Sequence, residues 1–303
     1  MVKRFPGFDS IAGYGTEAQR IRFTRIPGGA NWGGITINGG AGSPTNRFAF
    51  ADFENNNSTA IDVNAGDLVL SHCTFANPGV QYLSLDGASF LVEDSHFPNA
   101  TAGFEPIHGT QGIKAGGRGL FLRNFIGRPT GYNDSIDFTG GNRPGPILQI
   151  IDNVFAGSDD DLLDLDSTDA WVEGNIFMHC HRNGASPDSS SGVSGGSDNA
   201  DNSHITVIGN LFYDVDQAAN AKQTNFYTFI NNTVVRQTKT GGIDTDAGVI
   251  TMADPGTPLG AGFYLEGNII HDAEKLVRTQ GVAQVTFTNN LFSQLPSSTC
   301  TRR

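Results

Sequence analysis

Long apolar segments are missing from this 303-residue chain. No apolar run approaches the ~20 residues of a membrane-spanning helix, so the sequence predicts no membrane insertion. Charged residues make up only 17%, and 19 Lys and Arg stand against 31 Asp and Glu, which gives a formal charge of −12. Because a nucleic-acid-binding protein needs a basic surface, this balance argues against a nucleic-acid partner.

The sequence also has few cysteines and no helical periodicity. Cys73, Cys180 and Cys300 are far apart, which predicts neither a disulfide framework nor a zinc site. The first residues, MVKRFPGF, contain no apolar segment of a signal peptide. No stretch has the apolar period of a long amphipathic helix, so the pattern favours an all-β protein.

One eight-residue pattern recurs along the chain: apolar, any, apolar, any, any, Asn, any, Phe. Its copies lie at 68–75, 90–97, 119–126, 148–155, 170–177, 205–212, 227–234, 263–270 and 285–292, with a weaker copy at 46–53. The base spacing is 22 residues, and four steps are longer because they contain insertions. Alternation within each copy predicts β-strands.

A 22-residue unit of short strands cannot bury its apolar face alone, but stacked units can. The sequence therefore predicts a single-stranded, right-handed parallel β-helix of about ten coils over 46–303, with an irregular start and the first coils in 1–45. The sixth position of the pattern is Asn in seven successive copies, which predicts an Asn ladder at a turn. The chain stops about ten residues after the last copy without a polar cap, so we expect a segment of a longer protein.

Each unit has a second short strand before the repeated pattern, and its outward-facing residues carry most of the polar chemistry. Aligning these strands predicts one outward column: Asp62, Ser84, Lys114, Asp137, Asp164, Ser194, Lys222, Thr251 and Arg278. Carboxylates stand in the middle coils of this column and are flanked by two lysines. The densest acidic segment is GSDDDLLDLDSTD at 157–169. Its repulsion must be offset, and oxygen-only ligands favour Ca²⁺. Solvated turns or carboxylates that share protons remain the alternative.

Nearly the whole chain resembles the right-handed parallel β-helix superfamily of pectate lyases, and residues 133–235 resemble the family-nine pectate lyases. The segment SDDDLLDLDS, followed by WVEGNIF, is similar to that family's Ser-Asp-Asp-Gly-Phe-Asp-Leu segment and the strand after it. The resemblance implies that Ca²⁺ is bound by Asp134, Asp160, Asp161 and Asp164, with a pairing of Asp159 and Asp160 as an alternative register. The family's base is a Lys on the next coil, where this chain has Ser194. Lys222, one coil further in the same predicted column, is the candidate base, and a surface lysine without a catalytic role is the alternative. The chain also resembles β-helix domains of large bacterial surface proteins, and both likenesses imply an extracellular or cell-surface location.

Inserted loops add basic groups near the acidic segment. Arg143, Arg182, His181 and Lys114 are candidate substrate-binding residues, because cations can hold sugar carboxylates. His181 follows His179 by two residues, and a histidine at such a turn has either a structural or a general-base role.

Three functions follow from these residues. The first is a calcium-assisted polysaccharide lyase that acts on an acidic glycan by β-elimination, with Lys222, Asp164 and Asp137 as catalytic residues. The second is a non-catalytic carbohydrate-binding or adhesive module with a structural calcium site. The third is a glycoside hydrolase that uses paired Asp side chains. A polysaccharide is the expected partner in each case.

Overall fold

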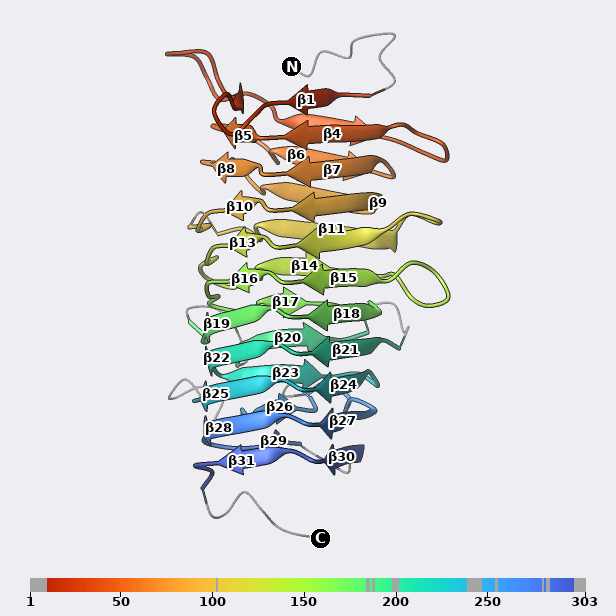
Figure 1. The fold of residues 1–303 in the computed structure, drawn as a ribbon, viewed down its shortest axis with the longest axis vertical. Coiled ribbons are helices and arrows are strands. Elements are labelled where there is room, and N and C mark those ends of the chain that lie inside the picture. The colour runs from red at the N-terminus through yellow and green to blue at the C-terminus, as the bar shows by residue number, and fades with distance from the viewer. Residues whose placement is uncertain are drawn as a thin grey trace.

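The computed structural model describes residues 10–101, 103–183, 186, 189–197, 202–238, 247–253, 256–279, 281 and 284–296. In these ranges the chain forms strands and no helices. The strands stack in chain order into one elongated solenoid, with the two termini at opposite ends (Figure 1). No helix of the described residues is long and apolar enough to cross a membrane.

Three sheets run along the solenoid, and β9 belongs to two of them. Among the described residues each coil adds one strand to each sheet, except the last coil, which adds only β30 and β31. The first sheet contains β1 (Ala12–Tyr14), β4 (Thr45–Ala49), β7 (Asp67–Ser71), the end of β9 (Leu83–Glu93), β12 (Gly119–Leu122), β15 (Leu148–Ile151), β18 (Ala170–Glu173), β21 (His204–Ile208), β24 (Phe226–Ile230), β27 (Gly262–Glu266) and β30 (Gln284–Thr288). The second sheet contains β2 (Ile21–Phe23), β5 (Ala51–Glu54), β8 (Thr74–Ala76), β10 (His96–Phe97), β13 (Phe125–Ile126), β16 (Val154–Phe155), β19 (Ile176–Cys180), β22 (Leu211–Val215), β25 (Thr233–Gln237), β28 (Ile269–Ala273) and β31 (Leu291–Ser293). The third contains β3 (Ile35–Asn38), β6 (Ile61–Asn64), the start of β9, β11 (Ile107–Ile113), β14 (Ile136–Phe138), β17 (Leu163–Asp164), β20 (Ser191–Gly195), β23 (Gln217–Ala221), β26 (Ile250–Thr251) and β29 (Val277–Arg278).

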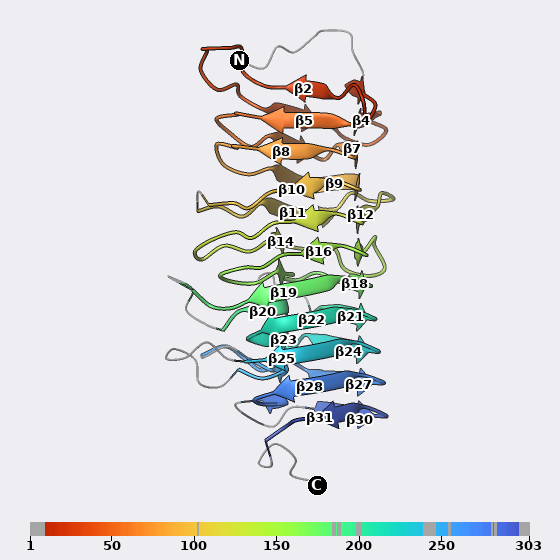
Figure 2. The same ribbon diagram turned by 60° about the vertical axis from the view of Figure 1, so that its left-hand side comes forward.

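Neighbouring strands within each sheet are parallel, and the register follows the sequence period. Leu70 of β7 pairs with Val92 of β9, which is 22 residues later, and both are buried. The stacked arrangement is also clear when the molecule is turned by 60° (Figure 2). The predicted parallel β-helix is therefore confirmed, and the apolar residues of alternating strand positions fill its interior.

The predicted Asn ladder is present where the first sheet turns into the second. Six successive side-chain amides each donate a hydrogen bond to the Asn Oδ1 of the next coil at 2.8–3.2 Å. The members are Asn124, Asn153, Asn175, Asn210, Asn232, Asn268 and Asn290. Next to this ladder, Phe side chains of the second sheet stack in the core, such as Phe155 on Phe177 with ring centroids 4.9 Å apart.

The outward column of the third sheet differs from the prediction at two positions. His108, not Lys114, lies between Ser84 and Asp137. Gln111 and Gly112 have positive φ angles, which break the alternation of β11 before Lys114 is reached. The prediction placed the column residue six positions too late along the chain.

The second difference is a two-residue shift in β23. Asn220, not Lys222, pairs with Ser194 of β20. Ala219 and Ala221 are both buried small residues, and a shift of two residues keeps every side chain on its predicted face. The alignment of Lys222 in this column was therefore wrong by two residues, although its outward direction was not.

Candidate functional site

A cavity of about 270 Å³ opens on the outer face of the third sheet. Its lining is dominated by carboxylates together with one lysine: Glu105, Tyr132, Asp134, Asp137, Asp160, Asp161, Asp164, Ser186, Ser189, Asn220 and Lys222. All the predicted metal ligands and all three predicted catalytic residues line this cavity.

Parallel stacking brings these side chains together. Asp137 of β14 lies beside Asp164 of β17 on the next coil, and both point outward from the same column. Asp134 precedes β14, and Asp160 and Asp161 precede β17, so the same corner of two successive coils contributes three more carboxylates. Lys222 directly follows β23, which extends the lining by two further coils.

Hydrogen bonds to the protein fix three of these carboxylates in place. The backbone N–H of Asp161 donates to Asp134 Oδ1 at 2.9 Å. The Ser186 hydroxyl donates to Asp160 Oδ1 at 2.8 Å, and the backbone N–H of Ser191 donates to Asp161 Oδ1 at 2.5 Å. The protein's own hydrogen bonds therefore hold Asp134, Asp160 and Asp161 in their positions at the cavity.

Burial and mutual repulsion disfavour the charged forms of these carboxyl groups. Burial raises the pKa of Asp134 well above its ordinary value, and the charge of Asp164 adds to this shift. Burial raises the pKa of Asp164 to about 8, and the charge of Lys222 partly opposes it. Burial also raises the pKa of Glu105 to about 7, with the charge of Asp137 as the next cause. The site must take up protons or a cation at neutral pH.

The cavity offers oxygen donors of the kind that a hard cation takes, but among the described residues only Glu105, His108 and Asp137 have their ligand atoms all within 4.8 Å of one another. Asp164 Oδ1 is buried and has no hydrogen-bond partner, and a buried polar atom without a partner is costly unless something binds it. Other carboxylates line the same cavity, and carboxylate oxygens are the ligands that Ca²⁺ prefers. Asp134, Asp160, Asp161 and Asp164 are the residues that would hold such an ion.

The predicted substrate-binding residues do not line the cavity. Arg143 Nη1 lies 2.9 Å from Asp169 Oδ2, and Lys114 forms an ion pair with Asp67. His181 Nδ1 lies 2.8 Å from Asp216 Oδ1. These three side chains pair with carboxylates that do not line the cavity.

Two further sequence-based assignments have a structural outcome. The Arg182 backbone N–H donates to Asp216 Oδ2 at 2.8 Å, while Nε and Nη1 of its side chain are buried without a hydrogen-bond partner. Asp159 forms an ion pair with Arg128, and its Oδ2 accepts a hydrogen bond from the Gly131 backbone at 2.9 Å. Asp159 therefore has a structural partner and does not line the cavity.

Sequence reasoning missed Glu105, His108, Tyr132 and Asn220. His108 Nε2 lies 3.3 Å from Asp137 Oδ2, and the signal for it was the Ile-His pair at the start of β11. Glu105 and Tyr132 lie in loops, where strand alternation gives no signal. Asn220 was displaced by the register error described above.

Ser194, at the position of the lyase family's base, is fully buried, and its hydroxyl has no hydrogen-bond partner. Thr251, further along the same column, is also fully buried. Of the two lysines predicted in this column, Lys114 and Lys222, only Lys222 lines the cavity.

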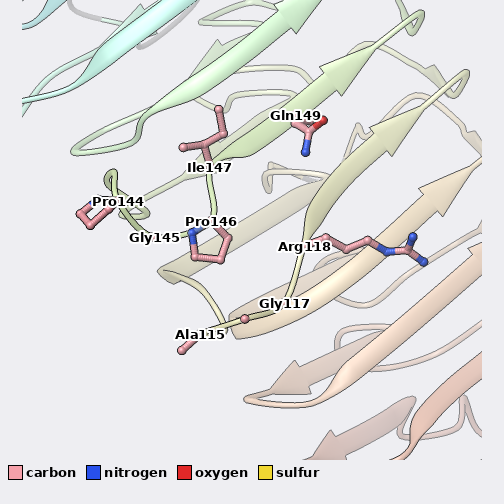
Figure 3. A pocket seen from close by; sticks show the side chains of 9 residues that line it. Ala115, Gly117, Arg118, Pro144, Gly145, Pro146, Ile147 and Gln149 are labelled. Atoms are coloured by element: carbon pink, nitrogen blue, oxygen red, sulfur yellow. The ribbon is translucent and has the colours of Figure 1, made fainter.

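A second pocket of about 510 Å³ lies between the loops at 115–118 and 144–147 (Figure 3). Its lining combines Gly, Pro, Ala and Ile with Arg118 and Gln149. It contains no carboxylate, histidine or lysine, so the acidic cavity is the better candidate for chemistry.

No protein-family model matches the sequence, and no curated protein matches it. Among solved structures, the A-module of mannuronan C-5 epimerase AlgE4 from Azotobacter vinelandii is similar over 95% of this chain and 87% of that chain. The sequence identity is 10% and the TM-score is 0.30. At these values the likeness carries no argument about activity, which is inferred from the cavity alone.

Proposed function

We propose that the protein is a calcium-assisted lyase that cleaves an acidic polysaccharide by β-elimination in the acidic cavity. The observation that carries this proposal is the meeting of Lys222 with Asp134, Asp160, Asp161 and Asp164 in one lining. A base and an oxygen-rich cation site are the two components that such a reaction needs at a uronate. The family-nine pectate lyase motif in the sequence supports the same assignment.

Asp134, Asp160, Asp161 and Asp164 would hold Ca²⁺, which would supply positive charge near the substrate carboxylate and so make the proton on the adjacent carbon more acidic. Lys222 Nζ accepts that proton after its own ammonium proton has passed to water, a loss that the charge of a nearby cation would favour. The C–H electron pair then forms the new double bond, and the C–O bond to the leaving sugar breaks with its electrons on oxygen. Water at the cavity mouth protonates that oxygen. Asp137 accepts hydrogen bonds from sugar hydroxyls beside the reacting carbon.

Hydrolysis is the second candidate function, and one observation favours it. Asp164, with its pKa at about 8, holds a proton at neutral pH when no cation is bound. A protonated carboxyl is the general acid that a glycoside hydrolase needs, and an ionised neighbour such as Asp161 would activate water. Calcium separates the two candidates, because a cation at Asp164 displaces the proton that hydrolysis requires.

Product analysis tests the proposal. A panel of polyuronates and neutral glycans is incubated with the protein, once with calcium and once with a chelator. The lyase predicts an unsaturated product that absorbs in the ultraviolet and disappears with the chelator. New reducing ends without unsaturation indicate the hydrolase instead. No product on any glycan, with a melting temperature that still rises with calcium, favours a non-catalytic carbohydrate-binding module at the cell surface.

A further inference from the structure

A second group of metal-ligand side chains lies on the wall of the acidic cavity. The ligand atoms of Glu105, His108 and Asp137 all lie within 4.8 Å of one another. All three side chains are half-buried, so they are held by the protein yet open to solvent. Glu105 and Asp137 also line the cavity, which leaves space on that side for water or a substrate oxygen.

The β-helix fixes two of the three ligands directly. His108 of β11 pairs with Asp137 of β14 on the next coil, and both face outward. His108 Nε2 lies 3.3 Å from Asp137 Oδ2. Glu105 belongs to the segment that leads into β11, two residues before the strand begins. The group therefore comes from two adjacent coils of a rigid sheet rather than from mobile side chains.

We propose that Glu105, His108 and Asp137 bind a first-row divalent cation of the Zn²⁺ type. The imidazole nitrogen distinguishes this group from the four-aspartate site, because Ca²⁺ takes oxygen ligands only and needs six to eight of them. Zn²⁺ accepts mixed nitrogen and oxygen ligands, and open sites commonly supply three protein ligands and one water. Charge also fits: two carboxylates and a neutral imidazole balance a divalent ion.

The inference does not depend on whether the cavity cleaves a polysaccharide. The competing explanation is a metal-free cluster in which His108 and Glu105 both interact with Asp137. Metal titration separates the two, because a metal-free cluster predicts no stoichiometric binding.

Isothermal titration of the chelator-treated protein with Zn²⁺ alone is the test. We expect one equivalent bound, a higher melting temperature, and at least a 10-fold loss of affinity in both His108→Gln and Glu105→Gln. His96→Gln and His179→Gln serve as matched controls, because these histidines lie in the second sheet, and they should bind Zn²⁺ like the unchanged protein. Unaltered melting temperatures without metal show that the variants fold.

Three results would overturn the proposal. The first is no Zn²⁺ binding by the unchanged protein. The second is an affinity in His108→Gln or Glu105→Gln that equals that of the unchanged protein, and the third is loss of binding in His179→Gln. The double variant Asp161→Ala with Asp164→Ala keeps the Zn²⁺ site intact, so its calcium response reports on the proposed lyase site separately.

Discussion

Asp137 and Asp164 lie side by side on adjacent strands, one coil apart, and both face the acidic cavity. Two ionised carboxylates in this arrangement repel each other, and further carboxylates from the same corner add to the repulsion. The fold holds them there through backbone pairing, so the energetic cost is built into the native state. Such a cost is typical of a binding or catalytic site.

Calcium should relieve this repulsion. We expect calcium to raise the melting temperature of the unchanged protein and to leave that of Asp161→Ala with Asp164→Ala unmoved. The reason is that the double variant removes two of the four aspartates proposed to hold the ion, and with them much of the repulsion between the carboxylates. Asp62→Ala is the matched control, because Asp62 lies in the same outward column three coils before Asp137. A calcium response that survives in the double variant would remove these residues from the site.

Lys222 should be required for cleavage. Substituting Lys222→Met keeps most of the unbranched side chain but removes the amine, so we expect kcat to fall by a factor of about 10² to 10⁴ while calcium still raises the melting temperature. Lys275→Met is the control, since Lys275 lies after β28 and does not line the cavity. Product formation is followed by the ultraviolet absorbance of the unsaturated sugar. Full activity in Lys222→Met would exclude it as the base.

The sequence predicted the coils and the acidic corner because both are local patterns. Asn and Phe recur at the sixth and eighth positions of the repeat, as Asn175 and Phe177 do, and the stacking of these residues follows from the period alone. Asp160 and Asp161 are adjacent in the chain, so their meeting needs no knowledge of register. Asp134 joins them because it occupies the matching corner one coil earlier.

Register within the third sheet could not be read so directly. Residues 107–108 and 113–114 each have an isoleucine followed by a polar residue, and alternation alone cannot choose between them. The positive φ angles of Gln111 and Gly112 break the alternation between the two pairs, so His108 and not Lys114 stands in the outward column. These angles depend on tertiary structure. The shift that separates Lys222 from its predicted column has the same origin, since a two-residue slip leaves the apolar pattern unchanged.

The Asn ladder should be a main source of stability. Asn175 Nδ2 donates to Asn210 Oδ1 at 3.0 Å and to the Ile150 carbonyl at 2.8 Å. Asn175→Ala leaves buried partners without hydrogen bonds, at about 1–3 kcal/mol for each unsatisfied group, so we expect a clearly lower melting temperature.

The control for this variant is Asn38→Ala. Asn38 is exposed and accepts a side-chain hydrogen bond from Asn64 at 3.3 Å, so little should change. Thermal unfolding followed by circular dichroism gives both values. Equal melting temperatures for the two variants would show that the buried ladder contributes no more than a surface hydrogen bond.

A pH-dependent contribution to stability should come from His181, which lies between two carboxylates. Its Nδ1 is 2.8 Å from Asp216 Oδ1, and its Nε2 is 3.2 Å from Asp214 Oδ1. Burial opposes protonation, but the hydrogen bond and charge of Asp216, followed by those of Asp214, outweigh it and raise the pKa of His181. The folded protein therefore binds this proton more tightly than the unfolded chain does.

Because the folded pKa lies above the unfolded value of about 6.5, the stabilisation is fully present below that value and is lost as the pH rises through the folded pKa. We expect His181→Gln to lower the melting temperature most near pH 5.5 and progressively less at alkaline pH. His96→Gln is the control variant, because His96 stacks on Phe125 with ring centroids 5.0 Å apart. Melting curves of the three proteins across this range provide the measurement. A His181→Gln effect that grows with pH would reverse the sign of the linkage and contradict the assignment of the two carboxylates as its partners.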